Sequence, residues 1–281
     1  MSATDRRDFR EAIARGPILL DAAMGTRLIA RGLDLAADDP CLWAVDHPEV
    51  VLEIHISDIQ AGSDALRTNT FGANRGWLDR FGRGDQASEI NRQAVRLARS
   101  AAGPGRFVVG SVGPTTSDRP GDLSEQAEAL LDEGIDALIL ETHRLDQAER
   151  ALLVLQGIGV PIVASLFAWP VAPAEAASRL GDLGAFAIGA NCLVGTAAAI
   201  DLARRIGPAF QGPLAFQPSA CLPGEPAEGP SVFGDAAAEL VTLGARLLGG
   251  CCGTTEAHVG ALRTALDRLS RLSSLPGRPS G

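Results

Sequence analysis

Residues 137–143 read ALILETH, a run of apolar residues followed directly by Glu141, Thr142 and His143. An unbroken apolar run of this length is typical of a strand buried on both faces, as in a parallel sheet. The polar residues mark the point where such a strand would leave the core. The stretch therefore predicts a buried parallel strand that ends at a polar site.

Seven further runs of this kind occur along the chain, and segments with helical apolar spacing separate them. The strand-like runs are residues 18–24, 64–71, 107–114, 161–167, 185–192, 213–220 and 245–252. The helical segments are residues 48–61, 88–102, 124–133, 146–155, 174–180, 197–206, 236–243 and 255–269. Eight strand-then-helix units predict a single-domain α/β fold, a (β/α)8 TIM barrel over residues 1–269. Residues 270–281 are rich in Ser, Pro and Gly, and we expect a disordered tail there.

Small or polar residues close nearly every one of these runs. They are Asp21, Thr68 to Thr70, Ser111, Glu141 to His143, Ser165, Asn191-Cys192, Gln217 to Ser219 and Cys251-Cys252. The C-terminal ends of barrel strands converge on one mouth, where the active sites of such barrels lie. The pattern therefore predicts a functional site at this mouth.

The overall composition excludes several classes of function. The formal charge is -9, so the chain lacks the basic surface that nucleic acids require. All 25 basic residues are Arg, which excludes a Schiff-base lysine and a P-loop lysine. No apolar run approaches the roughly 20 residues of a membrane helix, and residues 1–15 do not resemble a signal peptide. We expect a cytoplasmic protein with neither a nucleic-acid nor a membrane partner.

Five cysteines carry the strongest chemical signal. Cys251 and Cys252 lie between glycines at the end of the eighth run, and Cys192 ends the sixth. Adjacent cysteines share a metal only if the backbone leaves strand geometry, which flanking glycines permit. Three thiolates suit zinc and leave a fourth position open for a substrate thiol. The alternatives are cysteines that act as small hydrophobes, or a redox disulfide between the vicinal pair.

Six motifs resemble the homocysteine S-methyltransferase family over residues 18–266. They are DAAMGT (21–26), TNTF (68–71), GSVGPT (110–115), ET (141–142), GANC (189–192) and GGCCGTT (249–255). The resemblance implies the same barrel, with Zn²⁺ held by Cys192, Cys251 and Cys252. It also implies that Asp21 and Glu141 contact the amino-acid substrate, which agrees with two carboxylates holding an ammonium.

Three further residues are candidate substrate contacts because they lie at the same mouth: Asn69, Ser111 and Asn191. One departure from the family pattern lies near them. The seventh strand is followed by Pro218 to Cys221, where relatives resembling methionine synthase have Asn in place of Ser219. Cys221 is then an extra thiol, either a fourth ligand or a packed loop residue.

The expected activity is transfer of a methyl group to the sulfur of homocysteine, or of a close thiol analogue, to give methionine. The donor stays open between a small onium compound and a separate corrinoid protein, and an oligomer is compatible with the sequence. Two rival hypotheses remain. One is a non-catalytic paralogue that binds zinc or thiols. The other is a metal hydrolase, for which the site lacks His and carboxylate ligands.

Overall fold

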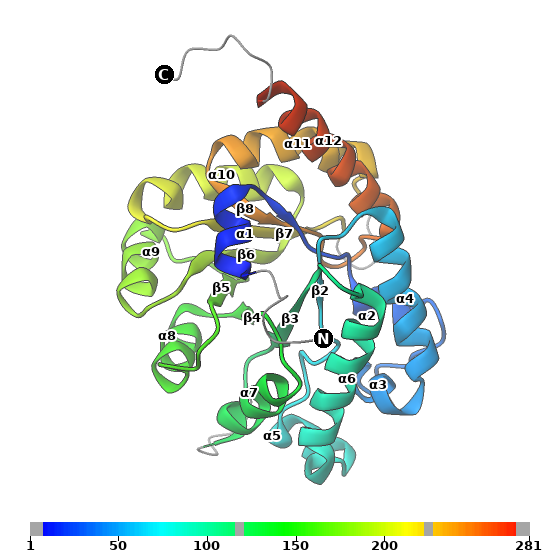
Figure 1. Cartoon of the computed structure of the whole chain (residues 1–281). Helices are drawn as coiled ribbons and strands as arrows, with labels where there is room; N and C mark the ends of the chain where they lie inside the picture. Colours follow the sequence, from blue (N-terminus) through cyan, green and yellow to red (C-terminus); the bar gives the residue numbers. More distant parts are fainter. Residues whose placement is uncertain (1–7, 116–120, 222–226, 274–281) are drawn as a thin grey trace.

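The computed structural model describes residues 8–115, 121–221 and 227–273. In these residues eight parallel strands form one sheet in the order β1-β8-β7-β6-β5-β4-β3-β2, which curls into a nearly closed barrel (Figure 1). The strands are β1 (Ile18–Leu19), β2 (Ala65–Arg67), β3 (Phe107–Val112), β4 (Ala137–His143), β5 (Ile162–Leu166), β6 (Ala187–Val194), β7 (Leu214–Ser219) and β8 (Ala245–Leu248). The (β/α)8 barrel predicted from the sequence is confirmed.

One long helix follows each strand and packs on the outside of the barrel (Figure 1). These helices are α4 (Pro48–Ala61), α6 (Ala87–Ala102), α7 (Asp122–Asp132), α8 (Leu145–Val154), α9 (Pro173–Asp182), α10 (Thr196–Ile206), α11 (Pro230–Thr242) and α12 (Glu256–Ser273). Four short helices, α1 (Phe9–Arg15), α2 (Met24–Ile29), α3 (Trp43–Asp46) and α5 (Arg75–Leu78), precede β1 or lie in the first two βα connections. None of the helices in the described residues is long and apolar enough to cross a membrane.

The seam between β1 and β2 is closed by Asp64. The backbone N–H of Asp64 donates to the carbonyl of Leu19 at 2.8 Å, and its carboxylate accepts the N–H of Leu19 at 2.9 Å. Arg263 of α12 donates to the same carboxylate at 3.1 Å. A side chain therefore joins the two strands at a point where the ladder hydrogen bonds are not regular.

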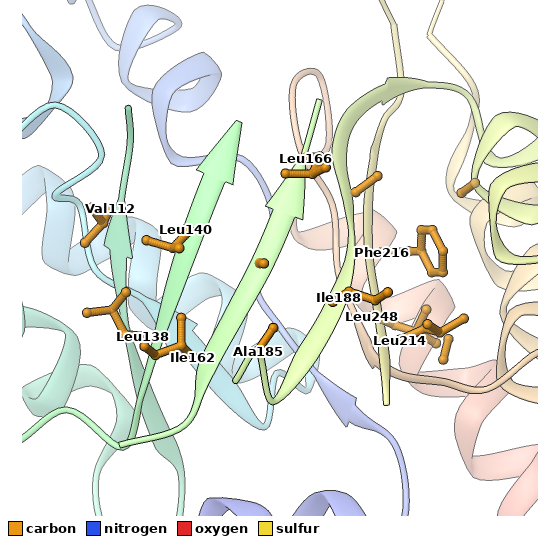
Figure 2. Packing of buried hydrophobic residues seen from close by; sticks show 14 of the residues in the cluster. Val112, Leu138, Leu140, Ile162, Leu166, Ala185, Ile188, Leu214, Phe216 and Leu248 are labelled. Carbon is orange, nitrogen blue, oxygen red and sulfur yellow. The ribbon is translucent and has the colours of Figure 1, made fainter. Parts of the chain in front are cut away.

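Alternation along the strands produces two layers inside the barrel. Apolar side chains fill the lower layer, from Ile18, Leu20, Ala65, Phe107, Val109, Ala137, Ile139, Val163, Ala187, Ala215 and Leu247. The residues between them face outward and pack against the helices, as Figure 2 shows for Leu138, Leu140 and Ile188. One step further along the strands, the same alternation gives a buried polar layer of Arg67, Ser111, Glu141, Ser165, Asn191 and Gln217. The polar ends of the apolar runs thus become the floor of the mouth.

Helix α1 covers the opposite end of the barrel (Figure 1). Its Phe9 and Ile13 are buried among the lower apolar layer, and Phe9 meets Phe107 edge to face with ring centroids 5.1 Å apart. Asp8 begins the helix, because its carboxylate accepts the N–H groups of Arg10 and Glu11. This helix was not predicted from the sequence.

Several predicted boundaries were wrong. Helix α11 begins at Pro230, six residues before the predicted start, and strands β2 and β8 each end four residues before the runs that contain them. The run 18–24 contains only a two-residue strand, because Met24 already begins α2. Strand β6 continues past Cys192 to Val194. Helix α12 continues to Ser273, because the helix-breaking Pro276 and Gly277 come only later, so residues 270–273 are not a disordered tail. Residues 274–281 lie outside the described residues.

Candidate functional site

A cavity of about 220 Å³ opens at the C-terminal end of the strands. Its walls come from the ends of β1, β2, β3, β4 and β6, and from the turn after β8. The predicted site residues all line it: Asp21, Asn69, Ser111, Glu141, Asn191, Cys192, Cys251 and Cys252. The structure therefore brings together all the residues predicted to bind the metal or the substrate, whereas His143, Ser165 and residues 217–219, also placed at the mouth, are not in the cavity wall.

The three predicted metal ligands form one cluster. The Sγ atoms of Cys192 and Cys251 are 3.0 Å apart, and those of Cys251 and Cys252 are 3.9 Å apart. All three sulfur atoms lie within 4.8 Å of one another. Sulfur ligands about 2.3 Å from a tetrahedral zinc would be about 3.8 Å apart. The Cys251–Cys252 pair has this spacing, whereas Cys192 and Cys251 would have to move apart to hold an ion.

The turn after β8 brings the adjacent cysteines to one side. Strand β8 ends at Leu248, so both cysteines lie beyond it, as their proposed sharing of a metal requires. Gly253 has φ 78°, a left-handed conformation that glycine adopts freely. Gly250 has no room for a side chain, since a Cβ atom there would lie 2.3 Å from Oγ1 of Thr254. The flanking glycines therefore act as the sequence predicted.

Cys192 reaches the cluster by a different route. In a regular strand, Asn191 and Cys192 would point to opposite faces. Cys192 instead has φ 58°, and the pairing of β6 with β7 shifts its register between Asn191 and Val194. Thr142 does the same on β4, with φ 59° and a register shift between Leu140 and His143. As a result both members of each consecutive pair line the cavity.

Asn191 holds these two left-handed residues together. Its Oδ1 accepts the backbone N–H of Thr142 at 2.8 Å and the hydroxyl of Ser165 at 2.9 Å. Its Nδ2 donates to Oγ1 of Thr142 at 2.6 Å and to Sγ of Cys192 at 3.6 Å. Asn191 thus orients the sulfur of Cys192, a predicted metal ligand, and its contact with the substrate stays a prediction.

Hydrogen bonding among the thiols distributes their protons unevenly. Hydrogen bonds from Cys192 and Cys251 lower the pKa of Cys252 to about 3. The hydrogen bond to Cys251 raises the pKa of Cys192 well above its ordinary value. One thiolate is therefore already stabilised in the cluster, and a cation such as zinc would stabilise the remaining two.

Arg67, which the sequence analysis missed, lies between the two predicted carboxylates. Its Nε donates to Oδ1 of Asp21 at 2.7 Å, and its Nη1 donates to Oε1 of Glu141 at 2.6 Å. Its Nη2 donates to three carbonyls, of Asp21, Ala22 and Gly250. Burial alone would lower the pKa of Arg67. The charges of Asp21 and Glu141 outweigh this effect and raise the pKa well above its ordinary value, so the guanidinium stays charged.

Two other predicted contacts are engaged within the protein. Ser111 donates its hydroxyl to Oε2 of Glu141 at 2.5 Å, and Asn69 donates to the carbonyl of Pro40 at 2.6 Å. Both still line the cavity. Cys221 lies outside the three-sulfur cluster and packs against Gly253, so the packed alternative fits the structure better than a fourth ligand.

A family model described as homocysteine S-methyltransferase matches residues 18–266. The chain belongs to this family. It is 29% identical to methionine synthase of Mycobacterium tuberculosis over 96% of its own length, and 30% identical to betaine–homocysteine S-methyltransferase 1 of Danio rerio over 93%. It spans 27% of that methionine synthase and 76% of the zebrafish enzyme.

The family resemblance extends to solved structures. The metallated form of the homocysteine methyltransferase MmuM from Escherichia coli superimposes with a TM-score of 0.72 at 26% identity. The alignment covers 93% of this chain and 97% of that one. The family and the barrel predicted from the sequence are thus confirmed.

Proposed function

We propose that this homocysteine S-methyltransferase family member is a zinc-dependent enzyme that methylates the sulfur of homocysteine. The single observation that carries the proposal is the group of three cysteine sulfurs, within 4.8 Å of one another, in the wall of a closed-bottomed cavity. Three thiolates are a zinc donor set, and three ligands leave one position for a substrate. A cytoplasmic location is part of the proposal, since all five cysteines are free thiols.

A zinc ion held there would lower the pKa of the acceptor thiol, which would bind as a thiolate, the nucleophilic form of sulfur, and the thiol proton would pass to solvent. Cys192, Cys251 and Cys252 would hold the metal, and Asn191 would fix the direction of the Cys192 sulfur through its 3.6 Å contact. The thiolate attacks the methyl carbon in line with the leaving group. The S–CH₃ bond forms while the bond to the donor breaks, and the bonding electron pair leaves with the donor. An onium donor departs neutral, so the transfer step needs no acid or base residue.

The methyl donor is tested by screening. Onium donors to be offered are S-methylmethionine, S-adenosylmethionine and glycine betaine, each with zinc-loaded protein and homocysteine. A methylated corrinoid protein is the other donor class. Methionine formation with any of these supports the proposal. Stoichiometric zinc without turnover from any donor would favour a non-catalytic zinc- or thiol-binding role.

Two cysteine variants make a matched pair for the metal. Cys252→Ala removes a member of the sulfur cluster, and we expect loss of stoichiometric zinc and of turnover. Cys221→Ser changes a neighbouring thiol that lies outside the cluster, and we expect wild-type zinc content. If Cys252→Ala keeps both zinc and turnover, the proposed function is wrong.

A further inference from the structure

We propose that Arg67 is a specificity-determining residue, which makes the α-amino group of the acceptor dispensable. The protein's own guanidinium already forms the ion pairs that a substrate ammonium would form with Asp21 and Glu141. The acceptor class is then thiols of homocysteine size with or without an ammonium group. The inference rests on the proposed function, because it concerns the acceptor at the same site.

Arg67, together with Ser111, supplies a hydrogen-bond donor to every carboxylate oxygen of the acid pair. Both carboxylate oxygens of Asp21 are engaged by this residue, Oδ1 by Nε at 2.7 Å and Oδ2 by its backbone N–H at 3.0 Å. Glu141 uses one oxygen for Nη1 of Arg67 and the other for the hydroxyl of Ser111. All four oxygens of the pair therefore have a donor from the protein.

Burial makes this pairing persistent. Arg67 is 8% exposed, Asp21 is 2% exposed and Glu141 is 7% exposed. Three carbonyl acceptors hold the other guanidinium nitrogen, including that of Gly250, directly before the cysteine turn. Swinging Arg67 aside for an ammonium would leave a buried cation and these carbonyls without partners, which is costly.

The net charge of Asp21, Glu141 and Arg67 also indicates that a substrate ammonium is dispensable. Two carboxylates alone would present a charge of -2 to an incoming ammonium. With Arg67 paired to both of them the sum is -1. An ammonium therefore gains little on binding, and a thiol that lacks it loses little.

The test compares two acceptors that differ only in the amino group. Homocysteine and 4-mercaptobutanoate are titrated into zinc-loaded protein by calorimetry, so the readout is a dissociation constant and no donor is required. We expect the wild-type Kd values to agree within about fivefold. An ammonium on an unneutralised buried carboxylate pair is worth about 30-fold or more, because each charged hydrogen bond contributes about tenfold or more.

Two substitutions of Arg67 separate charge from shape. Arg67→Gln removes the cation, and we expect homocysteine to be preferred by about 30-fold or more. Arg67→Lys also loses the carbonyl contacts but keeps the positive charge. We expect its ratio of the two Kd values to stay near that of the wild type. If Arg67 had only a structural role, both substitutions would change the ratio of the two Kd values alike.

The outcomes distinguish this inference from the proposed function. If wild-type protein binds homocysteine but discriminates more than 30-fold against 4-mercaptobutanoate, Arg67 does not replace the ammonium and only this inference fails. If neither thiol binds zinc-loaded protein, the acceptor assignment itself fails with it. The wild-type comparison decides the question even where a variant does not fold.

Discussion

Thr142 and Cys192 meet at the mouth of the barrel, with Oγ1 and Sγ 3.9 Å apart, and both have left-handed backbone. Among the described residues they are the non-glycine residues with positive φ, at 59° and 58°. A β-branched residue in this region costs roughly 1–2 kcal/mol, and such strain concentrates at functional sites. Here it turns Thr142 and Cys192 into the same cavity as Glu141 and Asn191.

Removing the hydroxyl of Thr142 should loosen Cys192. Thr142→Val keeps the β-branch but leaves Nδ2 of Asn191 without its 2.6 Å acceptor. We expect stability to fall by about 1–2 kcal/mol and zinc affinity to fall about tenfold. Denaturant unfolding and competition with a zinc chelator measure these effects. Thr142→Ser keeps the hydroxyl and should bind zinc like the wild type; equal losses in both variants would contradict the idea.

Gly250 should tolerate no side chain. A Cβ atom would lie 2.3 Å from Oγ1 of Thr254, whose hydroxyl donates to the carbonyl of Cys251 at 2.7 Å. Gly250→Ala should therefore displace the cysteine turn, at about 1–3 kcal/mol of stability, and weaken zinc binding. The control is Gly260→Ala in helix α12, where nothing lies within 4 Å and where alanine should stabilise by about 0.5–1 kcal/mol. Unchanged zinc affinity in Gly250→Ala would show that the turn adapts.

His143 should make the fold sensitive to acid. Burial lowers its pKa to about 4, while its Nδ1–H donates to the carbonyl of Glu141. In the unfolded chain the pKa returns to about 6.5, so the unfolded state takes up a proton that the folded state refuses as the pH falls between these values. The stability that depends on neutral His143 is therefore complete above pH 6.5 and is lost progressively as the pH falls to 4.

Titration of His143 lowers the free energy of unfolding by about 2 kcal/mol between pH 7 and pH 5. His143→Asn retains a donor for the carbonyl but has no titrating group, so its stability should fall by about 2 kcal/mol less over this interval. Urea unfolding at the two pH values measures the difference. His47 is exposed, and His47→Asn should keep the wild-type pH dependence. A parallel pH response in His143→Asn would mean that other groups dominate.

Phe9 should affect stability without affecting the metal. It is 4% exposed, contacts Phe107, and lies at the end of the barrel opposite the cysteines. Phe9→Ala should cost about 3–5 kcal/mol, as for other buried aromatic truncations. Leu153→Ala, at a site 52% exposed, should change stability by less than about 0.5 kcal/mol. Calorimetric melting of both, with zinc titration, tests the separation; a weakened zinc site in Phe9→Ala would refute it.

The sequence predicted the features that depend on long, regular patterns. The eight apolar runs each overlap an observed strand, and α4 has the bounds expected from its spacing and from Gly62. The mouth was predictable because parallel strands place their C-terminal ends together. The short α1 was missed because its charged residues conceal the buried Phe9 and Ile13, although Asp8 is a recognisable N-cap.

The details of the site were less accessible. Arg67 could have been found, since alternation from the buried Ala65 points it into the barrel, but it was not separated from the polar residues that follow. The left-handed Thr142 and Cys192 carry no signal in the sequence, because neither is Gly or Asn. Asn191 joins them by a hydrogen bond to Thr142, 49 residues away, and by a contact with its neighbour Cys192.

Helix α1 affects how reactants reach the three sulfurs. The apolar layer inside the barrel and the α1 residues Phe9 and Ile13 fill the end opposite the sulfurs, so in the described residues the sulfurs are reached from the C-terminal ends of the strands. If an acceptor occupies the sulfurs as proposed, its donor has to approach through the same open side of the cavity.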